Sequence, residues 1–189
     1  MKSIKSAFAL STVLLATSAH ADFLGANAEA GLFSGDDASG SYASLDIQHP
    51  IPLIPNVRLD ILDLETDDSP SVDVTHFDIT GYYGVGLLWL GVEGGLTFRE
   101  LEIGTTDKSV PMLYLAANLS IPGTGISLAA ESKSISSYDD TTISDQLFKI
   151  QYQPLPIIGL EAGYRTLEQE IDSINMDYDG YFIGVTIDI

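Results

Sequence analysis

Apolar and polar residues alternate along most of this chain. The final segment shows the pattern clearly, because Ile183, Val185 and Ile187 share one face while Gly184 and Thr186 share the other. A period of two residues is typical of a β-strand with different surroundings on its two faces. Ten segments follow this period: 22–33, 41–49, 56–66, 72–85, 88–103, 109–121, 125–137, 142–153, 157–170 and 177–189. None of them combines a helical period with capping residues, so the sequence predicts an all-β fold.

The connections between these segments are of two kinds, which alternate along the chain. One kind is long or acidic and lies at 34–40, 65–71, 104–108, 138–141 and 172–176. The other is short, apolar and rich in Pro or Gly, and lies at 49–56, 84–87, 122–125 and 154–156. Successive connections of an antiparallel meander lie at opposite ends of the sheet, so one end is acidic and the other compact. This asymmetry predicts a closed, antiparallel, up-and-down transmembrane β-barrel of about ten strands. Eight strands with an extended N-terminal segment are the alternative.

One face of the predicted strands is apolar and is expected to point outward. Its members are Leu24, Ala26, Ala28, Leu45, Ile47, Val57, Leu59, Ile61, Phe77, Ile79, Leu90, Val92, Leu96, Leu115, Leu119, Leu128, Phe148, Ile150, Leu160 and Ala162. Aromatic residues gather near the ends of the segments. We expect Tyr82, Tyr83, Trp89 and Tyr152 near the compact end and Tyr42, Phe98, Tyr164 and Tyr181 further along, as in the interfacial girdles of membrane barrels. Ordinary strand composition is the alternative explanation, since aromatic residues favour strands.

The opposite face carries the charges and is expected to line the lumen. Its members are Glu29, Asp46, Arg58, Asp60, His76, Asp78, Glu93, Arg99, Glu131, Lys133, Lys149, Glu161, Arg165 and Asp188. Every basic residue after position 21 except Lys108 belongs to this set. An isolated charge in a closed lumen is costly, and pairing offsets much of that cost. The sequence therefore predicts an ion-pair network that fills the lumen. In a soluble periplasmic barrel or β-sandwich, the alternative fold, the apolar face would point inward.

The first 21 residues have the layout of a cleavable secretory signal peptide. Lys2 and Lys5 form a basic start, residues 7–16 are mostly apolar, and Ala19-His20-Ala21 is an A-x-A cleavage site. We expect residues 1–21 to be removed and residues 22–189 to form one outer-membrane barrel domain. A short N-terminal membrane anchor is the alternative, but about 20 apolar residues are needed to span a bilayer.

Composition excludes several partners and sites. The net charge is −19 for the whole chain. It becomes −21 without residues 1–21, which contain Lys2 and Lys5 and no acidic residue. A chain this acidic is not expected to attract nucleic acid or anionic lipid by electrostatics. The sequence contains no Cys, so it can form neither a disulfide nor a thiolate metal site.

Several stretches resemble one protein family. They are the leader, the proline-rich turn at 49–59, the segment 160–165 and the closing strand at 180–189. Together they make the chain similar to small, uncharacterised outer-membrane β-barrel proteins of Gram-negative proteobacteria. The resemblance implies a location in the outer membrane, contact with outer-membrane lipid and lipopolysaccharide, and insertion by the barrel-assembly machinery, which reads the final strand. That strand usually ends in an aromatic residue, whereas here it ends in Ile189.

Three classes of function follow. The first is a monomeric barrel with a structural or surface-interaction role, and it involves no catalytic, cofactor or metal site. The second is a small channel, which the excess of carboxylates would make cation-preferring. The third is a lipid- or peptide-modifying enzyme that depends on His76, which shares a face with Asp78 and Thr80. We expect His76 to serve only as a hydrogen-bonding residue of the lumen, because no nucleophile motif accompanies it.

We expect the acidic connections to be solvated, although Asp pairs such as Asp67-Asp68 and Asp139-Asp140 offer ligands to divalent cations.

Overall fold

The computed structural model describes residues 25–51, 53–67, 71–104, 106–171 and 174–189. The predicted signal peptide and Leu24 lie outside the described residues. Ten strands make up the fold: β1 (Gly25–Gly35), β2 (Ala38–Gln48), β3 (Asn56–Thr66), β4 (Asp73–Leu87), β5 (Leu90–Ile103), β6 (Thr106–Ile121), β7 (Ile126–Tyr138), β8 (Thr141–Tyr152), β9 (Ile158–Ile171) and β10 (Ile174–Asp188). In this part of the chain, no helix has the length and hydropathy needed to cross a membrane.

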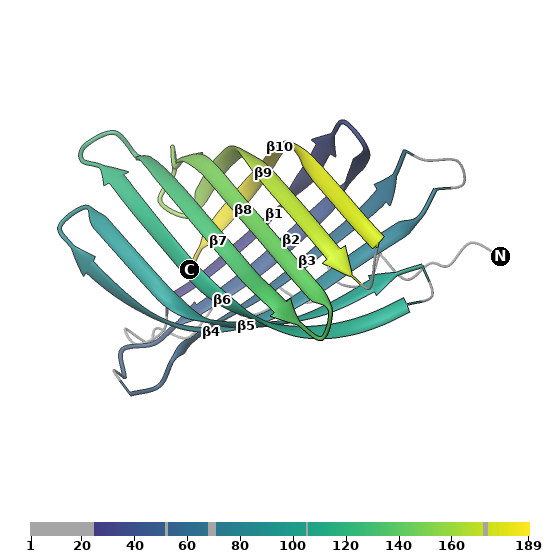
Figure 1. Ribbon diagram of the computed structural model, residues 1–189. Helices are drawn as coiled ribbons and strands as arrows, with labels where there is room; N and C mark the ends of the chain where they lie inside the picture. Colours follow the sequence, from purple (N-terminus) through teal and green to yellow (C-terminus); the bar gives the residue numbers. More distant parts are fainter. Residues whose placement is uncertain (1–24, 52, 68–70, 105, 172–173) are drawn as a thin grey trace.

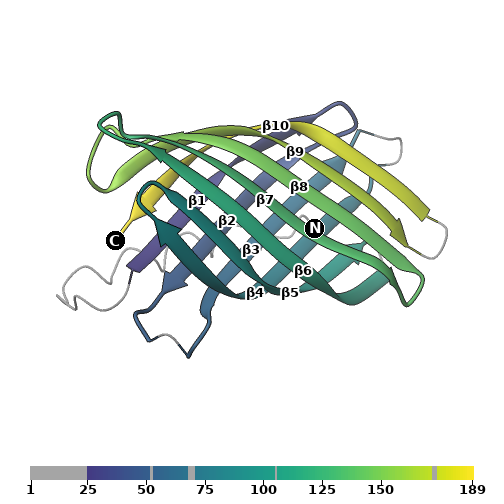
Figure 2. The ribbon, with the colours of Figure 1, turned by 60° about the vertical axis from the view of Figure 1, so that its left-hand side comes forward.

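The strands form one closed antiparallel barrel. Each strand pairs with the next along the chain, and β10 pairs with β1 to close the sheet, as Figures 1 and 2 show. At the closing seam, Ile189 N donates to Ala26 O at 2.8 Å. Asn27 Nδ2 donates to the Asp188 carboxylate at 2.5 Å. The predicted closed ten-strand meander is confirmed, and the eight-strand alternative is wrong.

The connections differ from the prediction. At the acidic end, β2 begins at Ala38 and β6 at Thr106, so the turns before them are short rather than long. The compact end instead has the longer connections, such as the one between β2 and β3. The predicted connections were too long because polar residues at the strand ends were interpreted as loop residues. In the structure these residues continue the alternation of the strands. We call the two ends of the barrel the acidic end and the terminal end, since Gly25 and Ile189 lie at the latter.

His49 organises the longest of these connections. The ring Nδ1 of His49 accepts the backbone N–H of Ile51 at 3.1 Å, and its Nε2 lies 3.1 Å from the carbonyl oxygen of Pro55. The His49 N–H donates to Asn56 Oδ1 at 3.1 Å. His49 is thus a structural residue of the turn.

The outer wall of the barrel has two zones. Nearer the terminal end lies an apolar belt, which includes Ala28, Leu45, Val57, Ile61, Ile79, Val85, Val92, Leu96, Leu113, Leu115, Leu119, Leu128, Phe148, Ile150, Leu160, Ile183 and Val185. Nearer the acidic end the same outward positions form an acidic collar, made of Asp63, Glu65, Asp73, Glu100, Glu102, Asp107, Glu168, Glu170, Asp177 and Asp179. These carboxylates are exposed. The wall therefore changes from apolar to acidic within single strands.

The interior has the opposite arrangement. Inside the belt lie the charged residues described below. Inside the collar lies an apolar plug of buried side chains: Phe33, Ala38, Leu62, Leu64, Val74, Leu101, Val110, Met112, Ile143, Leu167, Ile171, Tyr178 and Phe182. On β3, for example, Arg58 and Asp60 point inward below Leu62 and Leu64. This reversal was not predicted from the sequence.

Like charges face one another across neighbouring strands of the collar. Glu65 is opposite Asp73, Glu102 is opposite Asp107, and Glu168 is opposite Asp177. Such pairs destabilise a sheet by roughly 0.2–1 kcal/mol each.

We therefore expect the triple variant Glu65→Gln, Glu102→Gln, Glu168→Gln to raise the free energy of unfolding by about 1–2 kcal/mol in low salt. Equilibrium urea unfolding of the refolded barrel measures this gain. In 1 M NaCl the gain should shrink, because the Debye length falls to about 3 Å. An equal gain at both salt concentrations would show that charge repulsion is not its cause.

Candidate functional site

Arg99 lies at the centre of the lumen and has no exposed side-chain surface. Its Nε and Nη2 donate to the two carboxylate oxygens of Asp78 at 2.7 and 2.8 Å. Arg99 Nη2 also donates to Asp145 at 2.6 Å. Arg165 donates to the same Asp145 carboxylate at 2.9 and 2.5 Å. Asp145 on β8 thus holds two guanidinium groups, one from β5 and one from β9.

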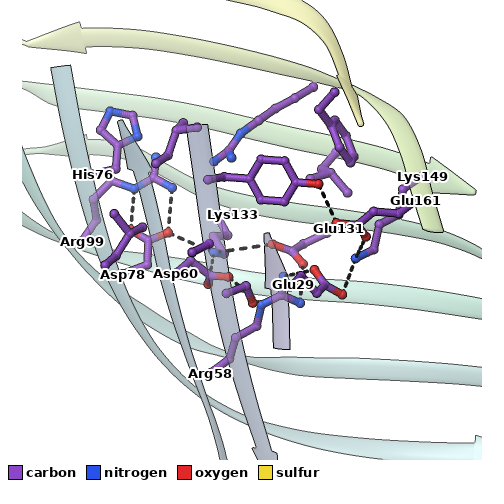
Figure 3. A pocket seen from close by; sticks show the side chains of 18 residues that line it. Glu29, Arg58, Asp60, His76, Asp78, Arg99, Glu131, Lys133, Lys149 and Glu161 are labelled. Carbon is purple, nitrogen blue, oxygen red and sulfur yellow. Dashed lines mark hydrogen bonds and ion pairs between the residues drawn. The ribbon is translucent and has the colours of Figure 1, made fainter. Parts of the chain in front are cut away.

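Lys133 and Arg58 continue the chain of ion pairs toward β3. Lys133 Nζ donates to Asp60 at 2.8 Å and to Asp78 at 2.9 Å. Arg58 Nε donates to Asp60 at 2.8 Å, and Arg58 Nη1 lies 3.1 Å from Glu131. Figure 3 shows these side chains pointing toward one another across the interior.

Lys149 extends this series of ion pairs to β1 and β9. Its Nζ donates to Glu29 at 2.6 Å and to Glu161 at 3.0 Å. Arg58 Nη2 lies 3.6 Å from Glu29, which joins this cluster to the previous one. The hydroxyl of Tyr42 donates to Glu161 at 2.6 Å. The result is one continuous lumen network of five cations and six carboxylates. Figure 3 shows the part of it that runs from Arg99 to Lys149.

All predicted lumen residues point inward, but some of them are not in this network. Asp46 accepts from the Tyr82 hydroxyl at 2.7 and 2.8 Å. Glu93 accepts from the Tyr114 hydroxyl at 2.9 Å. Asp188 belongs to the closing seam, as described above. These carboxylates lie nearer the terminal end and are held by neutral donors instead of cations.

His76 contacts Gln169 and not the two residues that share its face on β4. Its Nε2 lies 3.3 Å from Gln169 Nε2, and both side chains are buried. Asp78 is occupied by Arg99 and Lys133, and Thr80 bonds to Thr97. Neither Asp78 nor Thr80 is hydrogen-bonded to His76 in the described structure.

Sequence reasoning missed three contributors to the interior. Asp145, which holds two guanidinium groups, was omitted from the predicted lumen residues. It has the same parity on β8 as Lys149, which means that the two lie an even number of positions apart and share a face of the strand. Tyr42 and Tyr82 were assigned to the aromatic girdles, and this was wrong because both lie inside the barrel. Their parity with Asp46 on β2 and with Asp78 on β4 could have placed them.

Other predicted girdle residues do lie on the outer wall. Tyr83, Trp89 and Tyr152 are about half exposed at the terminal end of the belt. Tyr164 and Tyr181 pack edge to face at 5.0 Å near the collar.

The network leaves little open space between its own side chains. The cavity between its side chains has a volume of about 30 Å³. A polar cavity of this size can hold water, whereas ligand pockets measure about 300–1,000 Å³, so the space between these side chains has no room for an organic substrate. Among the described residues, no group of three or more His, Asp or Glu side chains is arranged to hold a metal ion.

The belt explains why charged residues are inside. A soluble barrel buries its apolar side chains and exposes its charges, whereas this belt does the reverse. Its strands are also long enough to cross a bilayer. The 15 residues of β4 rise about 38 Å along the axis at about 3.3 Å per residue and a tilt of about 40°. The apolar band of a membrane barrel is about 25 Å tall.

The chain is a membrane-spanning β-barrel. Closed antiparallel barrels with an outward apolar band are of the outer-membrane type. The strands continue beyond the membrane at the acidic end, where water surrounds the collar and the plug forms an ordinary apolar core.

No family model matches this chain. A search of curated proteins finds no match.

Among solved structures, the chain is similar to an anion-selective porin from Comamonas acidovorans, with 13% identity and a TM-score of 0.45. The match covers 86% of this chain and 56% of the porin, so the chain spans little more than half the length of that protein. It is also similar to Neisserial surface protein A, with 14% identity, a TM-score of 0.40, and coverage of 87% of this chain and 96% of that one. A third similar structure is the outer membrane protease OmpT from Escherichia coli, with 8% identity, a TM-score of 0.36, and coverage of 88% and 94%. The membrane band described above follows from the geometry of this chain alone.

Proposed function

We propose that this protein is a closed, non-conducting barrel of the outer membrane that presents its acidic collar at the cell surface. The role is structural or interactive. The observation that carries the proposal is the ion-pair network, which fills the middle of the lumen beneath the apolar plug. Two successive layers of different chemistry close the same passage. An aqueous channel would need an open path through both.

The orientation follows from charge and from the chain ends. Both Gly25 and Ile189 are at the terminal end, as in even-stranded bacterial barrels. We place that end in the periplasm and the acidic end outside. The partners in this proposal are outer-membrane lipid, lipopolysaccharide and the barrel-assembly machinery, and the protein acts as a monomer.

We propose no enzymatic role. The residue on which such a role would depend is His76, which is only 2% exposed and contacts Gln169. A substrate would have to displace the plug or the lumen network to reach this ring.

Planar-bilayer recording tests the proposal. Barrels that run faster on a denaturing gel before boiling than after boiling are folded, and these are the ones to reconstitute. We expect no discrete conductance steps above the background of the empty bilayer. Long-lived, cation-preferring steps from the folded barrel would show that the lumen conducts and would contradict the proposal.

A further inference from the structure

The wall of the barrel is short where β2 meets β3. On β3 the outward residues change from apolar to acidic between Ile61 and Asp63, and the strand begins at Asn56. From Leu62 to Asn56, β3 rises about 15 Å along the axis, at about 3.3 Å per residue and a tilt of about 40°. The apolar band of a membrane barrel is about 25 Å tall, so about 10 Å of the band lies beyond the end of β3. Residues 49–55 form the connection that continues from this edge.

The neighbouring strand β4 shows how deep this connection lies. His76 pairs with Leu62, and β4 rises about 18 Å from His76 to Tyr83. The hydroxyl of Tyr83 donates to the carbonyl oxygen of Leu53 at 3.1 Å. In Figures 1 and 2 the connection projects from the edge of the wall and does not fold across the opening of the barrel. Leu53 is therefore on the outside of the barrel, in the lower part of the band.

The surface of the connection is apolar. Leu53 is 88% exposed, and Ile51 and Ile54 are about half exposed. Residues 49–57 contain no Asp, Glu, Lys or Arg. Because Val57 belongs to the belt, the apolar surface of the connection is continuous with the surface that faces lipid.

The backbone of the connection is paired within the protein. The ring of His49 accepts the N–H of Ile51 and lies 3.1 Å from the carbonyl oxygen of Pro55. The N–H of Ile54 donates to the Ile51 carbonyl oxygen at 3.2 Å, and Pro50 has no N–H. Irregular backbone is excluded from the hydrocarbon of a membrane because unpaired polar groups are costly there. A solvated turn has no such requirement, since water pairs with its backbone.

We infer that residues 49–55 are a membrane anchor, a turn that inserts into the inner leaflet of the outer membrane. The side chains of Ile51, Leu53 and Ile54 lie among phospholipid acyl chains, near the headgroups, and His49 keeps the backbone of the turn paired. The anchor extends the belt where β3 ends short of the inner face of the membrane. This inference rests on the orientation proposed above and adds a lipid contact to it.

Tryptophan quenching in lipid vesicles tests the anchor. Leu53→Trp is combined with Trp89→Phe, so that the barrel contains a single tryptophan. In vesicles of phosphatidylcholine brominated on its acyl chains, this tryptophan should lose most of its emission relative to unbrominated vesicles, and acrylamide should quench it weakly. Glu100→Trp with Trp89→Phe is the control in the collar and should show the reverse. If Leu53→Trp does not fold, Ile51→Trp reports on the same turn.

The role of His49 is tested in the same vesicles. His49→Leu removes the ring that pairs with the backbone of Ile51 and Pro55 and adds apolar surface. In the barrel with Leu53→Trp, it should increase quenching by acrylamide, because the unpaired backbone groups draw the turn toward water. Unchanged quenching would overturn the role given to His49.

Strong quenching of Leu53→Trp by acrylamide would show that the turn lies in water and would overturn the inference. A blue-shifted emission that brominated lipid does not quench would overturn it as well, because it would show that a second copy or another protein covers the turn. The tests of the proposed function are separate. Discrete conductance steps in a planar bilayer, or failure of an impermeant maleimide to label Glu100→Cys in whole cells, would contradict that proposal without changing the quenching.

Discussion

Replacing Arg99 by leucine is expected to lower the free energy of unfolding of the barrel by about 3–5 kcal/mol. Arg99 is completely buried and donates to both Asp78 and Asp145. Its loss leaves six network carboxylates facing four cations in a closed space. Breaking a buried pair from one side is costly because the remaining charge keeps its desolvation penalty. Urea unfolding in lipid or detergent measures the effect, with the single tryptophan Trp89 as the fluorescent probe.

Two further variants make this prediction specific. Adding Asp78→Asn to Arg99→Leu removes one of the excess carboxylates, and it should restore part of the lost stability. Lys108→Leu removes a basic residue that lies outside the lumen network, and it should cost no more than about 1 kcal/mol. If Arg99→Leu costs no more than Lys108→Leu, the lumen network is not a main source of stability.

Placing arginine in the belt is expected to give the second large effect. Leu160 on β9 is about half exposed on the outer wall, and Leu160→Arg should cost about 2–4 kcal/mol in a bilayer. Glu168 lies on the same face of the same strand, in the collar opposite Asp177. Glu168→Arg should be neutral or slightly stabilising, because it replaces a repulsive pair with an attractive one.

Folding yield in vesicles, read from the unboiled gel band, and urea unfolding of the folded fraction both report this difference. The two variants introduce the same side chain at sites eight residues apart on one strand. Similar losses for both would place Glu168 inside the membrane as well, which would contradict the division into belt and collar.

Much of the fold could be predicted from alternation alone. The strand at 56–66 matches β3 to the residue, and the residues of β4 and β5 predicted to line the lumen, such as Asp78 and Arg99, point inward as their parity required. Strand parity is local, since each side chain faces away from its neighbour. For that reason a single sequence was enough to separate the lumen face from the lipid face within the belt.

The reversal of polarity at the collar could not be predicted in the same way. Leu62 and Leu64 have the same parity as Arg58 and Asp60, but the medium outside the wall changes from lipid to water between them. Parity shows whether a side chain points into the lumen or outward. It does not show whether lipid or water surrounds the barrel at that position along its axis. Of the collar acids, only Glu65 and Asp107 fell in predicted connections; the others fell in predicted strands, where parity alone did not show that water surrounds them.

The identity of the ion pairs was also beyond the sequence. Asp145 meets Arg99 because closure of the barrel brings β8 across the lumen from β5. Strand pairing alone placed Arg99 opposite Asp78. The partners across the lumen depend on the diameter of the barrel and on the strand tilt, which no local pattern records.

Spin labelling along β5 tests most directly the claim that the belt faces lipid and the collar faces water. The sequence has no native cysteine, so each single-cysteine variant carries a single label. In reconstituted barrels, labels at Val92, Leu96 and Phe98 should be accessible to molecular oxygen and shielded from a water-soluble nickel chelate. Labels at Glu100 and Glu102 should show the reverse. The crossover between Phe98 and Glu100 would place the membrane boundary where the belt meets the collar. Equal access of the nickel chelate to all five positions would show that this wall faces water throughout, and would contradict the membrane-spanning barrel.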